Sequence, residues 1–442
     1  MTQRILLLLL LAILSGGCTL FRPINQEGNI DNADNGETIT LSRQPGVYGV
    51  INDTTGLQRE IGAAQDTISL QRQIDDVTQE TVSKPGEVLI FNSDSLLCEA
   101  DTAAVAVEEI SVVPAVYTFA LTGDIMPGTS FPDNRYLPPG DDPWPLISEV
   151  APFISEAFIA AGNLEGPLTD KGELAKKCRD TTSCYAFRIP ERYGSMLTDA
   201  GFDILSLANN HIGDFGLEGR NRTAWLLDSL GIASAGLETS PFTIVQKDSL
   251  TIGFAAFSPN KGTPYINDYK YMQELVRFLD DTCDIVMVSF HGGAEGREYE
   301  NVTGAKEYFY GEDRGNVVEF ARLAVDSGAD IVFGHGPHVT RAMEVYKERF
   351  IAYSLGNFLT YRRFNLSGPN GIAPLVQVSV DPDGKYRSAV IIPLYQDSQG
   401  HVRVDPHRRV IGRLRDLIAM DFPDSDITVS DEGFVELKTA EQ

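Results

Sequence analysis

The sequence predicts a layered α/β domain that closes with an antiparallel hairpin. Two observations lead to this fold class. From Ala115 onward, short apolar runs rich in Val, Ile and Phe alternate with stretches whose apolar residues recur at helical spacing, and this alternation is typical of an α/β domain. Beyond residue 373 the pattern becomes APLVQVSVDPDGKYRSAVIIPLY, in which two alternating strands flank the turn signal Asp-Pro-Asp-Gly.

The expected strands are seven apolar runs, in the order VYTFAL (116–121), AFIAAG (157–162), DILSLA (203–208), TIGFAAF (251–257), DIVMVSF (284–290), DIVFG (330–334) and FIAYSL (350–355). The expected helices lie between them, at RTAWLLDSLG (222–231), YMQELVRFLDD (271–281) and NVVEFARLAVDSG (316–328). Each helical stretch ends in Gly or Asp, which marks its boundary. The domain is therefore expected to span residues 113–420, and residues 421–442 are expected to be a polar C-terminal tail.

Composition and charge exclude two classes of protein. The chain has 442 residues, of which 43% are hydrophobic and 9% aromatic, so it is not a disordered protein. Its formal net charge is 36 minus 62, or -26, and this charge would repel a phosphate backbone. Nucleic acid is therefore not an expected partner.

The first 18 residues are expected to be an export signal. Arg4 precedes an apolar run from Ile5 to Leu14, which is too short to span a bilayer as a stable helix, and small residues follow up to Cys18. This ending resembles a bacterial lipoprotein signal, in which the cysteine after the cleavage site is lipidated. We therefore expect an exported protein of the cell envelope that is lipid-anchored to a membrane through Cys18. An uncleaved anchor and plain secretion are the alternatives.

Residues 19–112 are expected to be an acidic, weakly structured spacer. They contain 5 Lys or Arg against 16 Asp or Glu, many other polar residues and few aromatic ones. Such a stretch lacks the apolar surface that a packed core requires.

Two cysteines of the polar stretch KKCRDTTSCY are close together in sequence. Export would place them in an oxidising compartment. We therefore expect Cys178 and Cys184 to form a disulfide.

Polar residues follow almost every expected strand. Ligands of open α/β sheets bind at the carboxyl ends of the strands, so these residues are candidates for a site. They are Asp124, Asn163, Glu165, Asn209, Asn210, His211, His291, Glu295, His335, His338 and Asn357. Asn210, His291 and His335 can meet in one cup only if the strands before them end on the same edge of one sheet. Such a mixture of nitrogen and oxygen ligands suits Zn, Mn or Fe rather than Ca.

Each of these residues also has an ordinary explanation. Asn and Asp are common turn formers, and a histidine at a strand end is more often a hydrogen-bonded residue than a ligand. The neighbouring glycines could simply terminate strands. The repetition at successive strand ends, which takes in four of the six histidines, favours a site.

Six motifs in order resemble the CapA family of bacterial poly-γ-glutamate capsule synthesis proteins. They are TGDIMPG, GNLEGPLTD, LANNHIGDFG, HGGAE, GADIVFGHGPHV and AYSLGNF, and the resemblance covers roughly Tyr117 to Val378. It implies a calcineurin-like metallophosphoesterase-type sandwich in an exported or membrane-anchored protein that helps to make or tether an anionic polyglutamate capsule. The implied partners are the capsule polymer or its precursor and other capsule synthesis proteins at the membrane.

The relation to metallophosphoesterases implies roles for individual residues, around one or two divalent ions. The implied metal ligands are Asp124, Asn163, Glu165, Asn210, His291, His335 and His338. His211 would protonate a leaving group as a general acid, and Asp214 would orient its imidazole. The residues assigned to substrate binding are Asn209, Glu295 and Asn357.

The site departs from the metallophosphoesterase pattern in its first half. The Asp-x-His motif of that family reads Asp124-Ile125-Met126 here, so one ligand histidine is missing. Asn163 stands where a bridging Asp is expected, with Glu165 as a candidate substitute. One extra residue also separates His338 from its motif partner.

Two further departures concern the CapA family itself. Gly292 stands where the family typically has Trp, and Gly336 stands where it typically has another His. Both changes widen or simplify the cup.

Two functions stay open at this point. The first is a metal-dependent phosphoesterase or glutamyl amide hydrolase or transferase, which the density of polar strand ends favours. The second is a non-catalytic polymer-binding scaffold of a capsule export complex, which the missing histidine favours. Because polyglutamate and this protein are both anionic, polymer binding would need a metal or a cluster of arginines. The candidate arginines are Arg188, Arg192, Arg297, Arg341, Arg362 and Arg363, and a solvated surface is their alternative role.

Overall fold

The computed structural model of the protein describes residues 29–31, 38–40, 87–89, 112–176 and 185–438. The chain divides into two units, Met1–Val113 and Pro114–Gln442. In the first unit, β1 (Asn29–Asp31) pairs antiparallel with β2 (Thr38–Thr40), and β3 spans Glu87–Leu89. β4 (Val112–Pro114) lies at the boundary. The expected export signal with Cys18, most of the expected spacer and the pair Cys178 and Cys184 lie outside the described residues.

The larger sheet of the second unit has ten strands within the described ranges. They are β5 (Tyr117–Met126), β6 (Ile159–Leu164), β7 (Ile204–Ser206), β8 (Ala233–Ala235), β17 (Asn357–Thr360), β18 (Ile372–Val380), β19 (Tyr386–Gln396), β20 (Val402–Val404), β21 (Ile427–Val429) and β22 (Phe434–Leu437). The order is β21-β22-β19-β18-β5-β6-β7-β8, with β17 beside β5 and β20 beside β19. Strands β5 to β8 and β17 run parallel, whereas β18 runs antiparallel to β5.

The smaller sheet has six strands in the same described part of the chain. They are β9 (Phe242–Lys247), β10 (Leu250–Phe257), β11 (Ile285–His291), β14 (Ile331–His335), β15 (Met343–Tyr346) and β16 (Arg349–Ala352). The order is β15-β16-β14-β11-β10-β9. The four central strands are parallel, and β9 and β15 are antiparallel at the edges. A separate hairpin consists of β12 (Glu307–Phe309) and β13 (Glu312–Gly315).

One hydrophobic core joins the facing sides of the two sheets. It holds Phe119 and Leu121 of β5 together with Phe254 of β10 and Val288 of β11. Alternate residues of β5, such as Ala120, belong to a second core on the other side of the larger sheet. Because successive side chains of a strand point to opposite faces, both faces of β5 are buried, and this explains why its sequence reads as a continuous apolar run.

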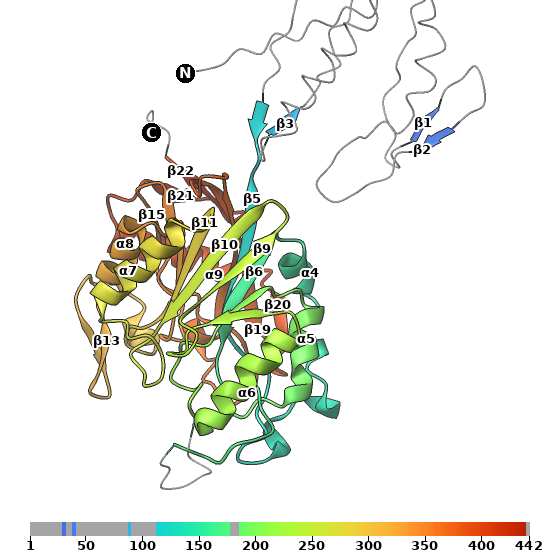
Figure 1. Cartoon of the computed structure of the whole chain (residues 1–442), viewed down its shortest axis with the longest axis vertical. Helices are drawn as coiled ribbons and strands as arrows, with labels where there is room; N and C mark the ends of the chain where they lie inside the picture. The colour runs from blue at the N-terminus through green and yellow to red at the C-terminus, as the bar shows by residue number, and fades with distance from the viewer. Residues whose placement is uncertain (1–28, 32–37, 41–86, 90–111, 177–184, 439–442) are drawn as a thin grey trace, which may run out of the picture. The chain divides into compact units, whose positions relative to one another are not determined.

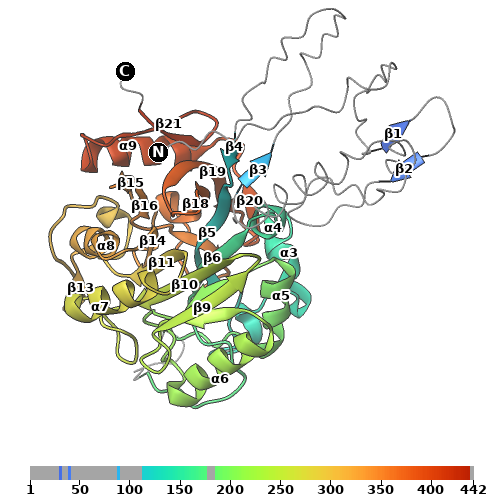
Figure 2. The same cartoon turned by 45° about the horizontal axis from the view of Figure 1, so that its top comes forward.

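Helices cover the two outer faces, so that the layers are helix, sheet, sheet and helix (Figures 1 and 2). The α-helices are α3 (Trp144–Ile147), α4 (Ala151–Ser155), α5 (Gly194–Asp199), α6 (Gly216–Ser229), α7 (Tyr269–Asp280), α8 (Val317–Asp326) and α9 (Arg409–Asp421). Short 3-10 turns occur at Asn134–Tyr136, Pro139–Asp141, Glu191–Tyr193, Arg297–Tyr299 and Gly368–Gly371. Helices α7 and α8 lie on the smaller sheet, whereas α3 to α6 lie beside the larger one. None of the helices that the structure describes is long and apolar enough to cross a bilayer.

Helix α7 shows why these segments are helical. The Asp268 side chain accepts a hydrogen bond from the Tyr271 backbone N–H at 3.1 Å and thereby caps the first turn. Met272, Val276 and Leu279 recur at helical spacing and are all fully buried against the smaller sheet. The predicted helix at 271–281 is thus confirmed.

The predicted C-terminal hairpin is confirmed, but the predicted polar tail is wrong in part. Strands β18 and β19 pair antiparallel across the Asp-Pro-Asp-Gly turn. Residues 427–437, which the sequence assigns to the tail, form β21 and β22, and β22 pairs with β19 through Val435 and Ala389. Ile427 and Val435 are buried and anchor these short strands, of which β21 lies at the edge of the sheet.

Candidate metal centre

The polar strand ends meet because of the register of the strands. On the larger sheet, Asp124 of β5 lies opposite Asn163 of β6 on one side and Asn357 of β17 on the other. On the smaller sheet, His291 of β11 lies opposite His335 of β14. The predicted convergence therefore needs a correction. Its residues come from the carboxyl ends of two facing sheets and not from one edge of one sheet.

Asn163 holds two carboxylates together. Its side-chain nitrogen donates to Asp124 Oδ1 at 2.8 Å and to Glu165 Oε2 at 2.5 Å, and all three side chains are fully buried. Its Oδ1 accepts a hydrogen bond from Asn209 Nδ2 at 3.0 Å. The amide oxygen thus faces Asn209, and the role of Asn163 as a metal ligand stays a prediction.

Every hydrogen-bonding group of the Asn209 side chain is paired within the protein. Its Nδ2 donates to Asn163 Oδ1 and to the Leu164 carbonyl, and its Oδ1 accepts from the backbone N–H groups of His211 and Ile212. An asparagine amide has two donor hydrogens and two acceptor lone pairs, so no capacity is left for a ligand. The predicted role of Asn209 in substrate binding is therefore wrong. It shapes the turn that presents His211.

Three histidines lie around the carboxylates. His338 Nδ1 is 2.8 Å from Asp124 Oδ2, and His335 Nδ1 is 3.6 Å from Asp124 Oδ1. His291 Nδ1 is 3.7 Å from Oε2 of the second carboxylate, Glu165. His338 adopts a left-handed backbone conformation with φ 57°, which is uncommon for a residue with a side chain and is typical of functional sites.

Several buried polar atoms of this cluster have no hydrogen-bond partner within the described part of the chain. They are Glu165 Oε1, Asn210 Oδ1 and both ring nitrogens of His291 and His335. Buried polar groups are nearly always paired, because leaving them unpaired costs free energy. Asp124, Glu165 and His291 each offer a ligand atom, and these atoms lie within 4.8 Å of one another. This set of donors could therefore hold a metal ion.

The protonation states also suit metal ligands. Burial lowers the pKa of His335 to about 4 and that of His291 well below its ordinary value, where the positive charge of Arg314 adds to the effect. Both imidazoles are therefore neutral at pH 7 and able to coordinate. Burial, together with the charge of Asp124, raises the pKa of Glu165 to about 8.

The pair of Asp124 and His338 is ionic. Burial alone would raise the pKa of Asp124, but the hydrogen bond and charge of His338 outweigh it and hold the pKa below its ordinary value. Burial alone would lower the pKa of His338, but the bond to Asp124 and the nearby carboxylates raise it to about 9. His338 thus carries a proton at neutral pH and anchors Asp124.

His211 stands beside this cluster and is held by Asp214. Its Nδ1 is 2.8 Å from Asp214 Oδ2, and the same carboxylate accepts the Phe187 backbone N–H at 2.8 Å. The Phe187 ring lies against the imidazole, with 4.2 Å between ring centroids. Burial lowers the pKa of His211 although Asp214 opposes the change.

Two other predicted substrate-binding residues lie at the border of the cluster. Asn357 uses its Nδ2 to hold the His338 and Asn370 carbonyls, both at 3.1 Å. Glu295 is half-buried, and its Oε1 is 3.2 Å from Arg314 Nη1. Asn210, Glu295 and His338 are partly exposed, so solvent reaches the cluster on their side.

Arg314 is a buried residue of this region that the sequence did not indicate. It lies on β13 of the hairpin, its side chain is 2% exposed, and it contacts the loop that follows His291. It belongs to the polar stretch GEDRGN, which lacks both an apolar run and a recognisable motif. No pattern in the sequence therefore distinguishes it from a surface arginine.

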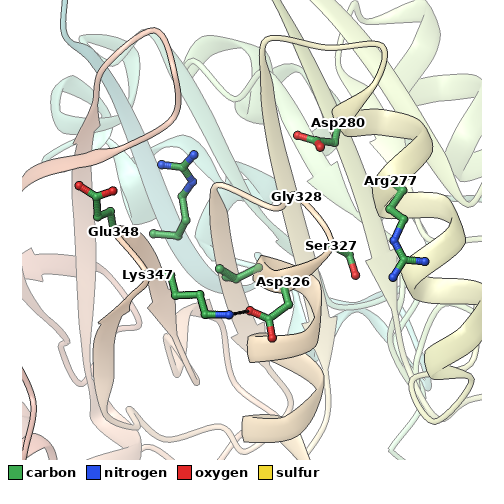
Figure 3. Close-up of a pocket in the computed structure, with 9 residues that line it drawn as sticks. Arg277, Asp280, Asp326, Ser327, Gly328, Lys347 and Glu348 are labelled. Carbon is green, nitrogen blue, oxygen red and sulfur yellow. Dashed lines mark hydrogen bonds and ion pairs between the residues drawn. The ribbon is translucent and has the colours of Figure 1, made fainter.

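A hollow of about 460 Å³ lies at the opposite end of the smaller sheet (Figure 3). The ends of α7 and α8 line it together with the turn between β15 and β16. Lys347 Nζ pairs there with Asp326 Oδ1 at 2.6 Å. The hollow lies near the first residues of β14 and β16, whereas His291 and His335 are the last residues of β11 and β14, so the hollow is separate from the candidate metal centre.

A family model described as bacterial capsule synthesis protein PGA_cap matches residues 118–362, which is more than half of the chain. The chain belongs to this family. It is 29% identical over 269 residues to the capsule biosynthesis protein CapA of Bacillus anthracis, covering 55% of this chain and 59% of that protein. It is 28% identical over 260 residues to the PGA biosynthesis protein CapA of Bacillus subtilis (strain 168), covering 55% and 63%. The match thus spans about six-tenths of the length of these relatives.

Other similar proteins include a probable polyglutamine synthesis accessory protein of Mycobacterium tuberculosis, 27% identical over 256 residues, with 51% of this chain and 62% of that protein covered. A solved structure of a hypothetical protein from Thermus thermophilus matches 65% of this chain and 100% of that chain, with a TM-score of 0.37 and 16% identity. The purple acid phosphatase PPD1 of yellow lupin matches 66% of this chain and 53% of that chain, with a TM-score of 0.32 and 10% identity.

Proposed function

We propose that this protein acts in the synthesis or anchoring of a poly-γ-glutamate type capsule, as an exported, lipid-anchored component with a metal-dependent site. Its family and the names of its Bacillus relatives support the capsule role. The reaction class would be hydrolysis or transfer at a phosphoester or a glutamyl amide. Capsule polymer or its precursor would be the substrate, and other capsule synthesis proteins at the membrane would be the partners.

The observation that carries the metal-dependent site is the set of buried polar side-chain atoms without partners in the described residues. Glu165 Oε1, Asn210 Oδ1 and the nitrogens of His291 and His335 are all of this kind. We assign these four residues and Asp124 as ligands of one or two ions of the Mn, Zn or Fe type. His338 would lie beside the ligands and orient Asp124 through their 2.8 Å contact.

The bound metal would polarise a phosphoryl or carbonyl oxygen and activate water. His211 would donate a proton to the leaving group. Asp214 Oδ2, at 2.8 Å from His211 Nδ1, would fix the ring orientation and stabilise the imidazolium form. Phe187 would keep the ring in place by packing against it.

A non-catalytic scaffold is the second candidate, and specific residues favour it. Met126 replaces a histidine ligand of metallophosphoesterases, and it is fully buried. The Asn163 amide nitrogen donates hydrogen bonds to Asp124 and Glu165. In metallophosphoesterases an Asp at this place bridges two ions. A site with these changes could bind a polymer without turning it over.

Elemental analysis of the full chain, purified without added metal and again after reconstitution with Mn, Zn or Fe, tests the proposal. We expect stoichiometric metal in the wild type and loss of that metal in His291→Ala and Glu165→Ala. The control His401→Ala should retain it, because His401 pairs with Asp397 in the turn between β19 and β20 and is not one of the candidate ligands. Hydrolysis of a phosphoester and of a γ-glutamyl amide is then measured on the loaded protein. Stoichiometric metal without turnover of either compound would favour the scaffold, and absence of metal after reconstitution would overturn the metal site.

A further inference from the structure

We propose that Arg314 is an anion-binding residue that selects a substrate carrying a phosphoryl or carboxylate group next to the metal centre. This inference rests on the proposed function, because it names the chemical class of the substrate at that site. It follows from the position and bonding of a single guanidinium group.

Three contacts fix the Arg314 side chain. Its Nε donates to the Gly293 carbonyl at 2.9 Å, and its Nη1 lies 3.2 Å from both Glu295 Oε1 and Glu312 Oε2. The Gly293 backbone N–H in turn donates to the Arg314 carbonyl at 3.0 Å. The guanidinium is therefore held rigidly against the loop that follows His291.

The remaining nitrogen, Nη2, is buried and finds no hydrogen-bond partner in the ranges that the structure describes. A Cβ atom placed on Gly336 would lie 3.0 Å from this Nη2 and also 3.0 Å from Cδ2 of the His291 ring. Nη2 and the His291 imidazole thus both lie close to Gly336, which directly follows His335 in the chain.

Two glycines keep side-chain atoms away from Arg314. Gly336 has φ 108°, a backbone conformation that favours glycine, and a side chain there would press on Arg314 Nη2. A side chain on Gly292 would lie 2.7 Å from Ile266 and 3.0 Å from the Arg314 carbonyl. Gly336 therefore leaves room for the guanidinium, whereas Gly292 leaves room for the Ile266 side chain and the Arg314 backbone.

An oxyanion is the ligand that this arrangement suits. A buried, charged N–H group without an acceptor is costly, and a guanidinium binds phosphate and carboxylate oxygens with short, charge-assisted hydrogen bonds. The chain as a whole has a net charge of -26, so an anionic substrate needs a local cation at the site. Arg314 supplies that cation beside the metal ligands.

Arg341 provides an instructive contrast. It is also fully buried near the same loop, but its Nη1 and Nη2 both donate to Glu307 at 2.8 Å, and Nη2 also donates to the Ala294 carbonyl. Both terminal nitrogens are thus occupied. Arg341 clamps the loop, whereas Arg314 keeps one terminal nitrogen available for a ligand.

Binding of inorganic phosphate and of glutarate to the full-length protein, measured by isothermal titration calorimetry with and without reconstituted metal, tests the proposal. In Arg314→Lys the charge remains but the Nη2 position is lost, and we expect the affinity for at least one anion to fall by roughly 10- to 100-fold. The matched control is Arg322→Lys. Arg322 lies on the outer helix α8 and forms two hydrogen bonds to the carboxylate of Glu344 on β15. We expect this control to bind both anions as the wild type does.

The two anions distinguish the two chemistries. Loss of phosphate binding alone indicates a phosphoryl group, and loss of glutarate binding alone indicates a carboxylate. Equal affinities of wild type and Arg314→Lys for both anions would overturn the inference, whether or not metal is present. Because the comparison is also made without metal, a protein that takes up no metal contradicts the proposed function and still tests Arg314.

A second variant keeps the test valid if Arg314→Lys does not fold. Glu312 is partly exposed, and Glu312→Gln removes one of the two carboxylates that neutralise Arg314. We expect at least one of the two anions, phosphate or glutarate, to bind several-fold more tightly to this variant. Weaker or unchanged binding of both anions would contradict the role of Arg314.

Discussion

The buried carboxylate of Glu165 is expected to lower the free energy of unfolding of the metal-free protein at high pH, although it helps to bind metal. Its ordinary pKa is 4.5, and burial together with Asp124 raises this pKa to about 8 in the folded, metal-free protein. Between these two values the folded protein holds a proton that the unfolded chain has released. The free energy of unfolding must therefore fall as the pH rises from 4.5 to 8. A glutamine side chain does not titrate, so Glu165→Gln should remove this dependence.

The size of the effect follows from the pKa values. One pKa unit corresponds to about 1.4 kcal/mol, and structural relaxation around a buried group reduces the full difference, so we expect about 2 to 4 kcal/mol. Urea unfolding of metal-free wild type and Glu165→Gln, at about pH 5 and about pH 9 with a chelator, measures it. The free energy of unfolding of Glu165→Gln, relative to that of the wild type, should increase by this amount from about pH 5 to about pH 9.

Added metal should reverse the order of stability. A metal that binds only the folded state stabilises it by mass action, and Glu165→Gln should lose most of that gain. Glu344→Gln is the matched control, since Glu344 is also buried but pairs with Arg322. This substitution should destabilise the protein at both pH values. If metal-free Glu165→Gln were no more stable than the wild type at the higher pH, the reasoning about buried Glu165 would be refuted.

Three further predictions address the neighbouring residues. His211→Ala should retain metal but lose about 10²- to 10⁴-fold in turnover, because it removes the general acid; parallel loss of metal would contradict this role. Asn209→Ala should lower the free energy of unfolding by about 1 to 3 kcal/mol by leaving buried partners unpaired, and an unchanged denaturation midpoint would count against its structural role. Cys178 and Cys184 should be resistant to alkylation in unreduced exported protein, and finding both thiols labelled would rule out the disulfide.

The strands and the hairpin were predictable because local patterns report them. Short apolar runs mark strands such as β11 and β14, which are buried on both faces. The turn at Asp-Pro-Asp-Gly marks the hairpin of β18 and β19. The polar residue at the end of each run then indicates where a site can form.

The division into two sheets was not predictable from such patterns. Strand β7 lies in the larger sheet, whereas β11 and β14 lie in the smaller one, and this depends on pairing between distant segments. Strands β21 and β22 were missed because they span only three and four residues and lie within a polar stretch. A local pattern cannot distinguish such strands from a polar tail.

Residue types alone also could not separate ligands from supporting residues. Asn163, Asn209 and Asn210 are chemically alike, but hydrogen bonds from the fold occupy the first two and leave Asn210 Oδ1 without a partner among the described residues. No sequence pattern identified Arg314, because its role depends on its burial and on its contacts with the loop after His291. These distinctions require three-dimensional contacts.

Anomalous X-ray diffraction from crystals of the full chain loaded with Zn tests the central claim most directly. We predict an anomalous peak at about 2.0 to 2.2 Å from ligand atoms of Asp124, Glu165 and His291. Substitution of His291 by Ala should abolish that peak. A peak located only at His401 or His407, or no peak in a protein that diffracts well, would contradict the metal centre.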